Sequence, residues 1–197
     1  MGVGQPVSRP LSALLGYLML SACLEADRPL MPSFALTGLD SPQEALIEGL
    51  AFDEKQGTLR VLQVDTVRFA KEGNMIRRYE FHPRQGGWVE SNTRYRLAPV
   101  PYDPFATYVE VREDHTGIEA EDEPPSYYYA LLRRSSRNTT FVWKVDCAKF
   151  PPAARASLGL SLDDDSCRVA SWRQVQSAIR EYTLERHKPD YRVILKE

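Results

Sequence analysis

The sequence predicts a single α+β domain, mainly an antiparallel sheet with a C-terminal amphipathic helix packed on one face. About seven short segments rich in β-branched and aromatic residues are separated by turn residues, which is typical of strands. One segment near the C-terminus repeats apolar residues at helical spacing. Because the strands precede this helix in one run, we expect an antiparallel sheet rather than alternating parallel βα units.

The composition is that of an ordinary globular domain. The chain has 197 residues, of which 43% are hydrophobic and 26% charged, enough for a real core. Its 25 basic and 27 acidic side chains show no basic excess, so we expect no nucleic-acid partner. No internal repeat is visible.

Residues 41–52 carry two competing signals. Ser41 is a good N-cap, Pro42 suits the first helical position and Glu44 completes a capping box, which together predict a short helix. A strand through residues 49–52 that leads into a turn is the alternative interpretation.

The next segments are predicted strands. Between residues 58 and 69 the apolar phase shifts, which predicts a strand with a bulge or one covered on both faces. In a later segment Tyr95 and Leu97 share one face and Arg94 and Arg96 the other, the pattern of a half-buried strand. The predicted strands after residue 69 are 75–81, 88–90, 93–98 and 107–112, with a turn at 82–87.

The last third of the chain combines a hairpin, a helix and a final strand. Residues 127–134 and 139–145 predict the hairpin, whose first strand is apolar on both faces and should be central. Residues 151–162 predict a short helical turn and a loop. Ser171 and Gln174 form a capping box for the most regular helix, and residues 190–195 alternate as a last strand.

The N-terminus predicts export. Arg9 precedes an almost wholly apolar run over residues 10–20, and Glu25 and Asp27 follow too soon for a membrane-spanning helix. This is the pattern of a cleaved signal peptide. An ordinary secretory signal, with Cys23 merely near the cleavage site, is one interpretation.

The segment Leu20-Ser21-Ala22-Cys23 resembles the lipobox of bacterial lipoproteins. The resemblance implies that the Cys23 thiol receives a diacylglyceryl group and that cleavage leaves Cys23 as the acylated N-terminus. Two or more acyl chains hold a protein stably on a membrane. Because Leu24, not Asp, follows the cysteine, the resemblance also implies the outer membrane, facing the periplasm. The membrane is therefore the first expected partner.

This resemblance divides the chain into three parts. Residues 1–22 are the expected signal peptide, residues 23–37 the lipidated N-terminus and a tether, and residues 38–197 the single domain. Pro29 and Pro32 lie in the tether segment, which shows no clear period.

The two remaining cysteines are expected to form a disulfide. Cys147 and Cys167 are an even pair in an oxidising compartment, and a bridge over a loop of this length would stabilise the fold by roughly 3 kcal/mol. Two free buried thiols are the alternative. The chain has no C-x-x-C, so a thioredoxin-like redox site is not expected.

Signals for catalysis are missing from the sequence. It has no G-x-S-x-G, H-E-x-x-H, P-loop or G-x-G-x-x-G. His82, His115 and His187 are scattered among turns and a helix end. Residues 163–165 could offer oxygens to Ca²⁺, but a solvated acidic loop explains them equally well. We therefore predict no enzyme activity, metal or cofactor.

Three arginines form a candidate basic patch. Arg94 and Arg96 share a face, and Arg78 joins them if the strand register allows, to meet anionic lipid head groups or cell-wall carboxylates. Surface pairing with Glu80 and Glu110 is the alternative interpretation.

Two aromatic motifs suggest a ligand. Residues 127–129 are three tyrosines that could stack on a ligand, although aromatic residues in strands usually belong to the core. Gly86-Gly87-Trp88 resembles the G-x-W of lipocalins, whose motif lies on the first barrel strand, whereas two or more strands precede it here.

Two functions follow from these patterns. The first is a non-catalytic binding or interaction domain at the membrane surface, which binds an envelope protein or a cell-wall component. The second is a periplasmic carrier or sensor of a small apolar ligand, similar to the lipocalins. A cavity of at least about 300 Å³ is typical of the second function.

Overall fold

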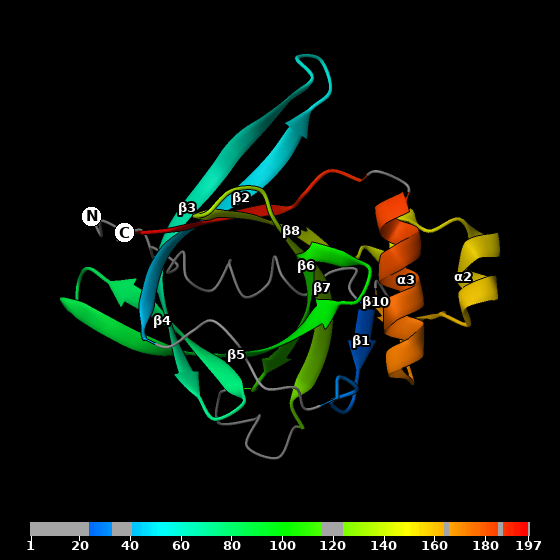
Figure 1. Ribbon diagram of the computed structural model, residues 1–197, viewed down its shortest axis with the longest axis horizontal. Helices are drawn as coiled ribbons and strands as arrows, with labels where there is room; N and C mark the ends of the chain where they lie inside the picture. The colour runs from blue at the N-terminus through cyan, green and yellow to red at the C-terminus, as the bar shows by residue number, and fades with distance from the viewer. Residues whose placement is uncertain (1–23, 33–40, 116–123, 164–165, 185–186, 197) are drawn as a thin grey trace, which may run out of the picture.

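Eight antiparallel strands close into a barrel in the computed structural model, which describes residues 24–32, 41–115, 124–163, 166–184 and 187–196 (Figure 1). Neighbours in the barrel are neighbours in the chain, and the last strand pairs with the first to close it. The barrel strands are β2 (Gln43–Asp53), β3 (Thr58–Glu72), β4 (Met75–His82), β5 (Gly87–Val100), β6 (Asp103–Glu113), β7 (Ser126–Arg134), β8 (Thr139–Lys144) and β11 (Tyr191–Leu195).

Between β8 and β11 the chain leaves the barrel and builds a layer on its outer wall. This layer holds the helix α3, which stands beside the barrel in Figure 1. Its elements are η1 (Cys147–Lys149), α2 (Pro152–Leu158), β9 (Ser161–Asp163), β10 (Ser166–Arg168) and α3 (Trp172–Leu184). No helix in the described ranges combines the length and apolar character needed to cross a membrane.

The N-terminal strand β1 (Leu24–Ala26) joins this layer to the barrel. It pairs antiparallel with β7 along residues 127–129 and parallel with β10. The rest of that edge of β7, residues 130–134, pairs with β8. The sheet therefore splits at β7, where one branch closes the barrel and the other supports α3.

The largest hydrophobic core lies outside the barrel, between its wall and α3. Trp172 of α3 packs its ring edge against Tyr108 and lies 6.3 Å from the ring of Tyr129. Val175, Ala178, Ile179 and Tyr182 of the same helix are fully or almost fully buried in this core. The strand face that carries Tyr108 and Tyr129 is therefore the outer face, and alternate residues point inward.

The predicted mainly antiparallel sheet and C-terminal helix are confirmed, but the sheet is a closed barrel instead of an open layer. Closure depends on pairing between β2 and β11, and no local pattern indicates such a distant contact. The helix expected over residues 41–50 is wrong. Residues 43–50 belong to β2, whose eleven residues pair with β3 and bury Ala45 and Ile47 on one face.

Most of the predicted strands are confirmed, although some of their boundaries differ. The expected bulge in residues 58–69 is present, because Gly49 pairs with Gln63 while Leu50 pairs with Val61, leaving Leu62 unmatched. Two predicted strands, 88–90 and 93–98, are one continuous strand, β5. The predicted hairpin of β7 and β8 and the final strand β11 are confirmed.

The predicted disulfide between Cys147 and Cys167 is present, with both cysteines fully buried. It joins η1 to β10 and so links two elements of the outer layer covalently. The predicted cap of α3 is also present, since the backbone N–H of Gln174 donates to Ser171 Oγ at 3.3 Å. The Gln174 side chain accepts from the Ala170 N–H at 2.9 Å.

Residues 24–32 differ from the tether expected over 23–37, because they pack on the barrel. Leu24 is fully buried in β1 and Met31 is 3% exposed. The carboxylate of Glu110, on the outer face of β6, accepts the backbone N–H groups of Leu30 and Met31 at 3.0 and 2.9 Å. Cys23 and the rest of the expected tether lie outside the described residues.

Candidate functional site

The inner surface of the barrel is predominantly apolar. Paired residues of neighbouring strands share a face, so the pairing shows which residues share the inward face of β7. Ala130 pairs with Val109 and Val109 pairs with Leu97, while Tyr95 lies two residues from Leu97 on the same face. Inward-facing residues include Ala45, Ile47, Val67, Phe69, Ile76, Tyr95, Leu97, Val109, Val111, Tyr128, Ala130, Leu132, Val142, Tyr191, Val193 and Leu195.

Much of this inner surface is accessible. Along β7 the outward residues Tyr127, Tyr129 and Leu131 are buried under the outer layer, whereas the inward Tyr128, Ala130 and Leu132 are only half-buried. The inward apolar residue of β8, Val142, is half-buried as well. On the opposite side, β2 and β3 bury Ala45, Ile47 and Val67 in a small internal cluster, against which the inward residues of β11 pack. The barrel is thus better filled beside β2, β3 and β11 than beside β7 and β8.

Arg78 is the buried cation of this inner surface. It lies on β4 opposite Phe69 of β3, and its side chain is only 7% exposed. Its Nη2 lies 3.1 Å from Oε1 of Glu80, the next inward residue of the strand. Within the described part of the chain, its Nε has no hydrogen-bond partner. An unpaired buried donor is rare in folded proteins and calls for an explanation.

The guanidinium of Arg78 stays charged despite its burial. Desolvation lowers its pKa, but Tyr95, Glu80 and Asp65 together outweigh this effect, so that the pKa is raised above its ordinary value. Tyr95 is also a hydrogen-bond partner of Arg78. The Asp65 carboxylate is itself engaged, since it accepts from the Gln63 side-chain amide at 3.2 and 3.3 Å. The site therefore combines one charged donor with an apolar wall.

The predicted basic patch of Arg78, Arg94 and Arg96 does not form. Arg77 lies opposite Arg94 on the outer face, so Arg78, the next residue of β4, points inside. The alternative interpretation, pairing with acidic neighbours, is the one observed.

Both outer arginines of the predicted patch are neutralised. Arg94 pairs with Asp114 at 2.5 Å, and Arg96 Nε donates to the buried Glu110 at 2.6 Å. Neither guanidinium is therefore an unpaired cation ready for an anionic surface.

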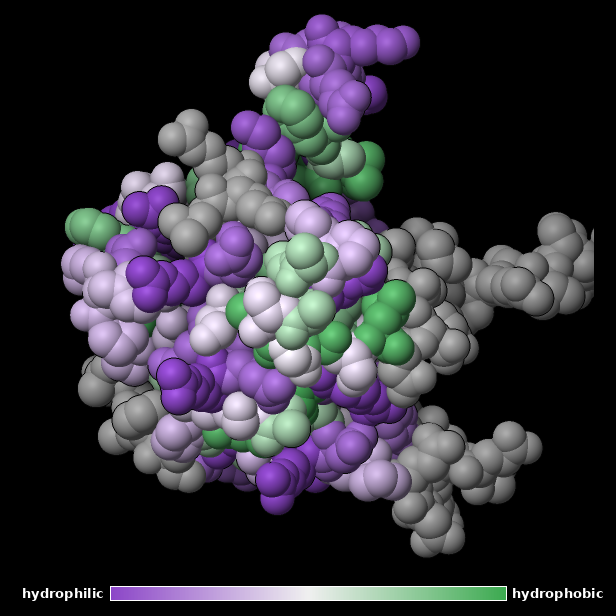
Figure 2. Space-filling view, turned by 90° about the vertical axis from the view of Figure 1, so that its right-hand side faces the viewer, coloured by the Kyte–Doolittle hydropathy of each residue, from purple (hydrophilic) through white to green (hydrophobic). Residues whose placement is uncertain are grey.

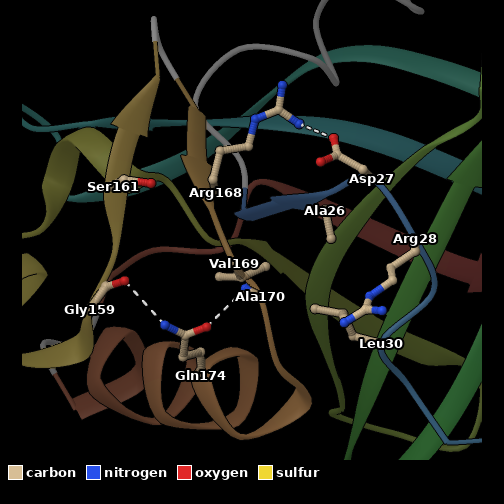
Figure 3. A pocket seen from close by; sticks show the side chains of 10 residues that line it. All are labelled: Ala26, Asp27, Arg28, Leu30, Gly159, Ser161, Arg168, Val169, Ala170 and Gln174. Atoms are coloured by element: carbon tan, nitrogen blue, oxygen red, sulfur yellow. Dashed lines mark hydrogen bonds and ion pairs between the residues drawn. The ribbon is translucent and has the colours of Figure 1, made fainter.

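A second concave site is a groove of about 750 Å³ on the outer layer (Figure 3). It opens where β1 and β10 diverge beyond Ala26 and Val169. The Arg168 side chain reaches across one side to Asp27 at 2.7 Å, and Gln174 joins the Gly159 carbonyl to the Ala170 N–H on the other (Figure 3). Asp27, Arg168 and Gln174 already bond to neighbouring groups, and Arg28 in the lining is exposed to solvent, unlike the buried Arg78 of the barrel interior.

A smaller hollow of about 240 Å³ lies on the outer wall between β6, β7 and β8, lined by Phe105, Phe141 and Trp143 among others. The Arg134 guanidinium lies 5.8 Å from the centre of the Phe105 ring and fills part of this space.

The hairpin arm, residues 50–61 of β2 and β3, projects from the barrel. It forms the projection at the top of Figures 1 and 2, with a hydrophilic tip and hydrophobic residues nearer its base. One face of the arm pairs Leu50 with Val61 and Phe52 with Leu59. These apolar residues are not covered, since Phe52 is 39% and Val61 is 44% exposed. The arm is therefore an amphipathic hairpin with a free apolar side.

The other residues considered from the sequence do not converge. His115 contacts Ser126, and the His187 ring stacks on Tyr182, 4.1 Å between ring centres. Among the described residues, no group of three or more His, Cys, Asp or Glu side chains could hold a metal ion. Residues 164 and 165 of the candidate calcium loop lie outside the described ranges.

Trp88 does not line the barrel. It begins β5, the fourth barrel strand, and packs on the outer face against Phe81 and under Arg68. The Gly86-Gly87-Trp88 motif is thus on a different strand from the lipocalin motif, and its tryptophan faces away from the barrel interior.

Comparisons of the chain with known protein families, with curated proteins and with solved structures find no match.

The sequence analysis does not predict the buried positions of two residues, Arg78 and Glu110. Arg78 is predicted on the surface beside Arg94 and Arg96 if the register allows, but the register pairs Arg77 with Arg94 and so places Arg78 inside. The buried role of Glu110 could have been suspected, because it alternates with Val109 and Val111 in a strongly apolar strand. Its contact with residues 30 and 31 has no sequence signal.

Proposed function

We propose that the protein is a non-enzymatic carrier or sensor of a small apolar molecule, which binds inside the barrel. The observation that carries this proposal is the half-buried apolar inner surface of β7, continued by Val142 of β8, at a place where a purely structural barrel would be filled. Barrels of eight strands have an interior just wide enough for side chains or one small ligand. The main core lies outside, so the fold does not depend on filling the interior.

The cellular context is part of the same proposal. Acylated Cys23 would hold the barrel at the bacterial cell envelope, and the Cys147–Cys167 disulfide supports an oxidising compartment. A carrier placed there would exchange its ligand with the neighbouring membrane. No catalytic residue is needed for this role.

Filling the interior should abolish binding. Ala130 points inward and Ala70 points outward, and both are half-buried alanines in barrel strands. Ala130→Trp should weaken the uptake of the neutral fluorescent probe N-phenylnaphthylamine at least about tenfold, because the indole occupies the volume a ligand needs. Ala70→Trp is the matched control and should bind the probe like the wild type.

Fluorescence titration of the folded variants measures both affinities. Equal probe affinity in the two variants would show that the probe binds elsewhere. Circular dichroism and the unfolding midpoint establish that each variant keeps the barrel.

The hairpin arm favours a second function, an interaction domain that binds an envelope protein. Its apolar side, together with Leu62 at 72% and Val64 at 52% exposed, is the kind of surface that mediates protein contacts. Leu62→Lys should abolish crosslinks to a partner in intact envelopes, whereas Leu162→Lys, at an exposed leucine of β9, should not. Identical crosslinks in both variants would count against the arm as the docking surface.

A further inference from the structure

The polar head of the ligand can be inferred from the surroundings of Arg78, an inference that rests on the proposed function. The Nε of Arg78 is a buried donor without a partner in the described part of the chain. Arg78 lies opposite Phe69 and hydrogen-bonds to Tyr95, both of which belong to the apolar inner surface. A molecule bound along this surface would bring one of its atoms to Nε, and that atom must be an acceptor.

The charges around Arg78 determine which acceptor is favoured. One guanidinium faces two carboxylates, Glu80 at 3.1 Å and Asp65 on the neighbouring strand. The inward face also carries Glu113 on β6 and two lysines, Lys71 on β3 and Lys144 on β8. A carboxylate head group at Arg78 would enter directly beside Glu80 and Asp65, and like charges repel strongly at low local dielectric.

An ammonium head group fits no better. It would be attracted by Asp65 and Glu80, but it has only donors and cannot satisfy Arg78 Nε. A neutral carbonyl or hydroxyl oxygen avoids both difficulties. It accepts from the guanidinium and brings no charge into the site.

We propose that the barrel selects apolar molecules with an uncharged oxygen head group, an alcohol, ester or ketone, whose oxygen accepts a hydrogen bond from Arg78 Nε. Glu80 and Asp65 hold the guanidinium in place and exclude anionic relatives of the same chain length. The apolar tail lies along the half-buried inward residues of β7 and β8.

A ligand series with one tail and four heads tests this selection on the wild-type protein. Dodecanol, dodecanoate, dodecylammonium and dodecane compete against N-phenylnaphthylamine at concentrations below micelle formation. Dodecanol should bind about tenfold more tightly than dodecane and dodecanoate, because a hydrogen bond to a charged donor favours it. A tenfold preference for dodecanoate, or equal affinities for all four, would overturn the selection and leave a barrel that binds apolar ligands unselectively.

Failure of the proposed function itself looks different. In that case neither the probe nor any member of the series binds inside the barrel, and Ala130→Trp changes nothing.

Two neighbouring arginines give a matched pair of variants. Arg78→Met removes the inner guanidinium and should erase the advantage of dodecanol over dodecane. Arg77→Met makes the same change one residue away, where the guanidinium lies outside and pairs with Glu72 and Glu90, and should preserve it. If Arg78→Met does not fold, Arg78→Met combined with Glu80→Gln removes both charges of the pair. Retention of the dodecanol preference in either inner variant would show that Arg78 is not the recognising group.

Discussion

Glu110 illustrates how a single charged residue can fasten two parts of this chain. Its carboxylate is 1% exposed and accepts from the backbone of residues 30 and 31 as well as from Tyr129. Arg96 is its ion-pair partner. Burial raises the pKa of the Tyr129 hydroxyl, and the Glu110 carboxylate raises it further, so Tyr129 stays protonated as a donor.

Loss of this carboxylate should be costly. Glu110→Ala leaves Arg96 without its partner, removes the acceptor of the buried Met31 N–H and removes one of two acceptors of the Leu30 N–H. We expect a loss of about 3–5 kcal/mol in the free energy of unfolding. Urea denaturation followed by circular dichroism measures it. Glu44→Ala is the control, because its ion pair with Arg68 is more than a third exposed and should contribute no more than about 1 kcal/mol. Equal losses would show that Glu110 has no special role.

Asp190 predicts a pH dependence of stability. Burial raises its pKa, and the hydrogen bond from the Lys144 N–H, at 2.7 Å, opposes the shift only in part. The folded state therefore holds this proton more tightly than the unfolded state does, and the contribution of Asp190 to stability grows as the pH falls through the raised pKa.

The variant Asp190→Asn tests the predicted direction of this pH dependence. Asn resembles the protonated acid and can still accept from Lys144, so the variant should be more stable than the wild type near neutral pH. That advantage should shrink as the pH is lowered. Urea midpoints at a series of pH values give the answer, and an advantage that grows on acidification would contradict it.

At the scale of elements, the disulfide should stabilise the outer layer more than the barrel. Cys147→Ser combined with Cys167→Ser opens a loop with a sequence separation of 20 residues. The expected loss is roughly 3 kcal/mol in the free energy of unfolding. Amide hydrogen exchange should rise first in η1, β10 and α3, since these elements depend on the bridge, while β3, β4 and β5 stay protected. Uniform deprotection of all strands would show that the layer and the barrel unfold as one unit.

The elements α3 and β2 also show which sequence signals are sufficient to predict an element. The helix α3 was predictable because its spacing and its cap at Ser171 are local. β2 was misread because Ser41, Pro42 and Glu44 imitate a helix start, while the pairing with β3 and β11 that decides the structure is not local. The Arg78 site could not be predicted for the same reason, since contacts between strands decide whether Arg77 or Arg78 pairs with Arg94, and a slip of one residue would exchange the two faces.

For the molecule as a whole, the predicted anchor has a direct test. Cys23→Ala should release the protein from membranes and abolish its labelling with radioactive palmitate, because the acyl chains are the attachment. Fractionation of cells that express each form measures the release. Cys147→Ser is the control and should stay on the membrane. An unlabelled wild type that remains membrane-bound would refute lipidation.

The position of β1 changes what an anchor at Cys23 would do. Because Leu24 is buried between β7 and β10, acyl chains on the preceding residue would hold the barrel close to the membrane instead of at the end of a long tether. The sequence predicted the attachment from four residues. It could not predict the short distance, since the docking of β1 depends on strands more than a hundred residues away.

The seam between β2 and β11 has a consequence for how the chain matures. Asp53 ends β2 and Tyr191 begins β11, so the barrel cannot close until almost all of the chain between them has been synthesised. Until then β2 and β8 present open edges that can pair with other chains. Chains interrupted before Tyr191 should therefore aggregate or be degraded instead of accumulating as partial barrels.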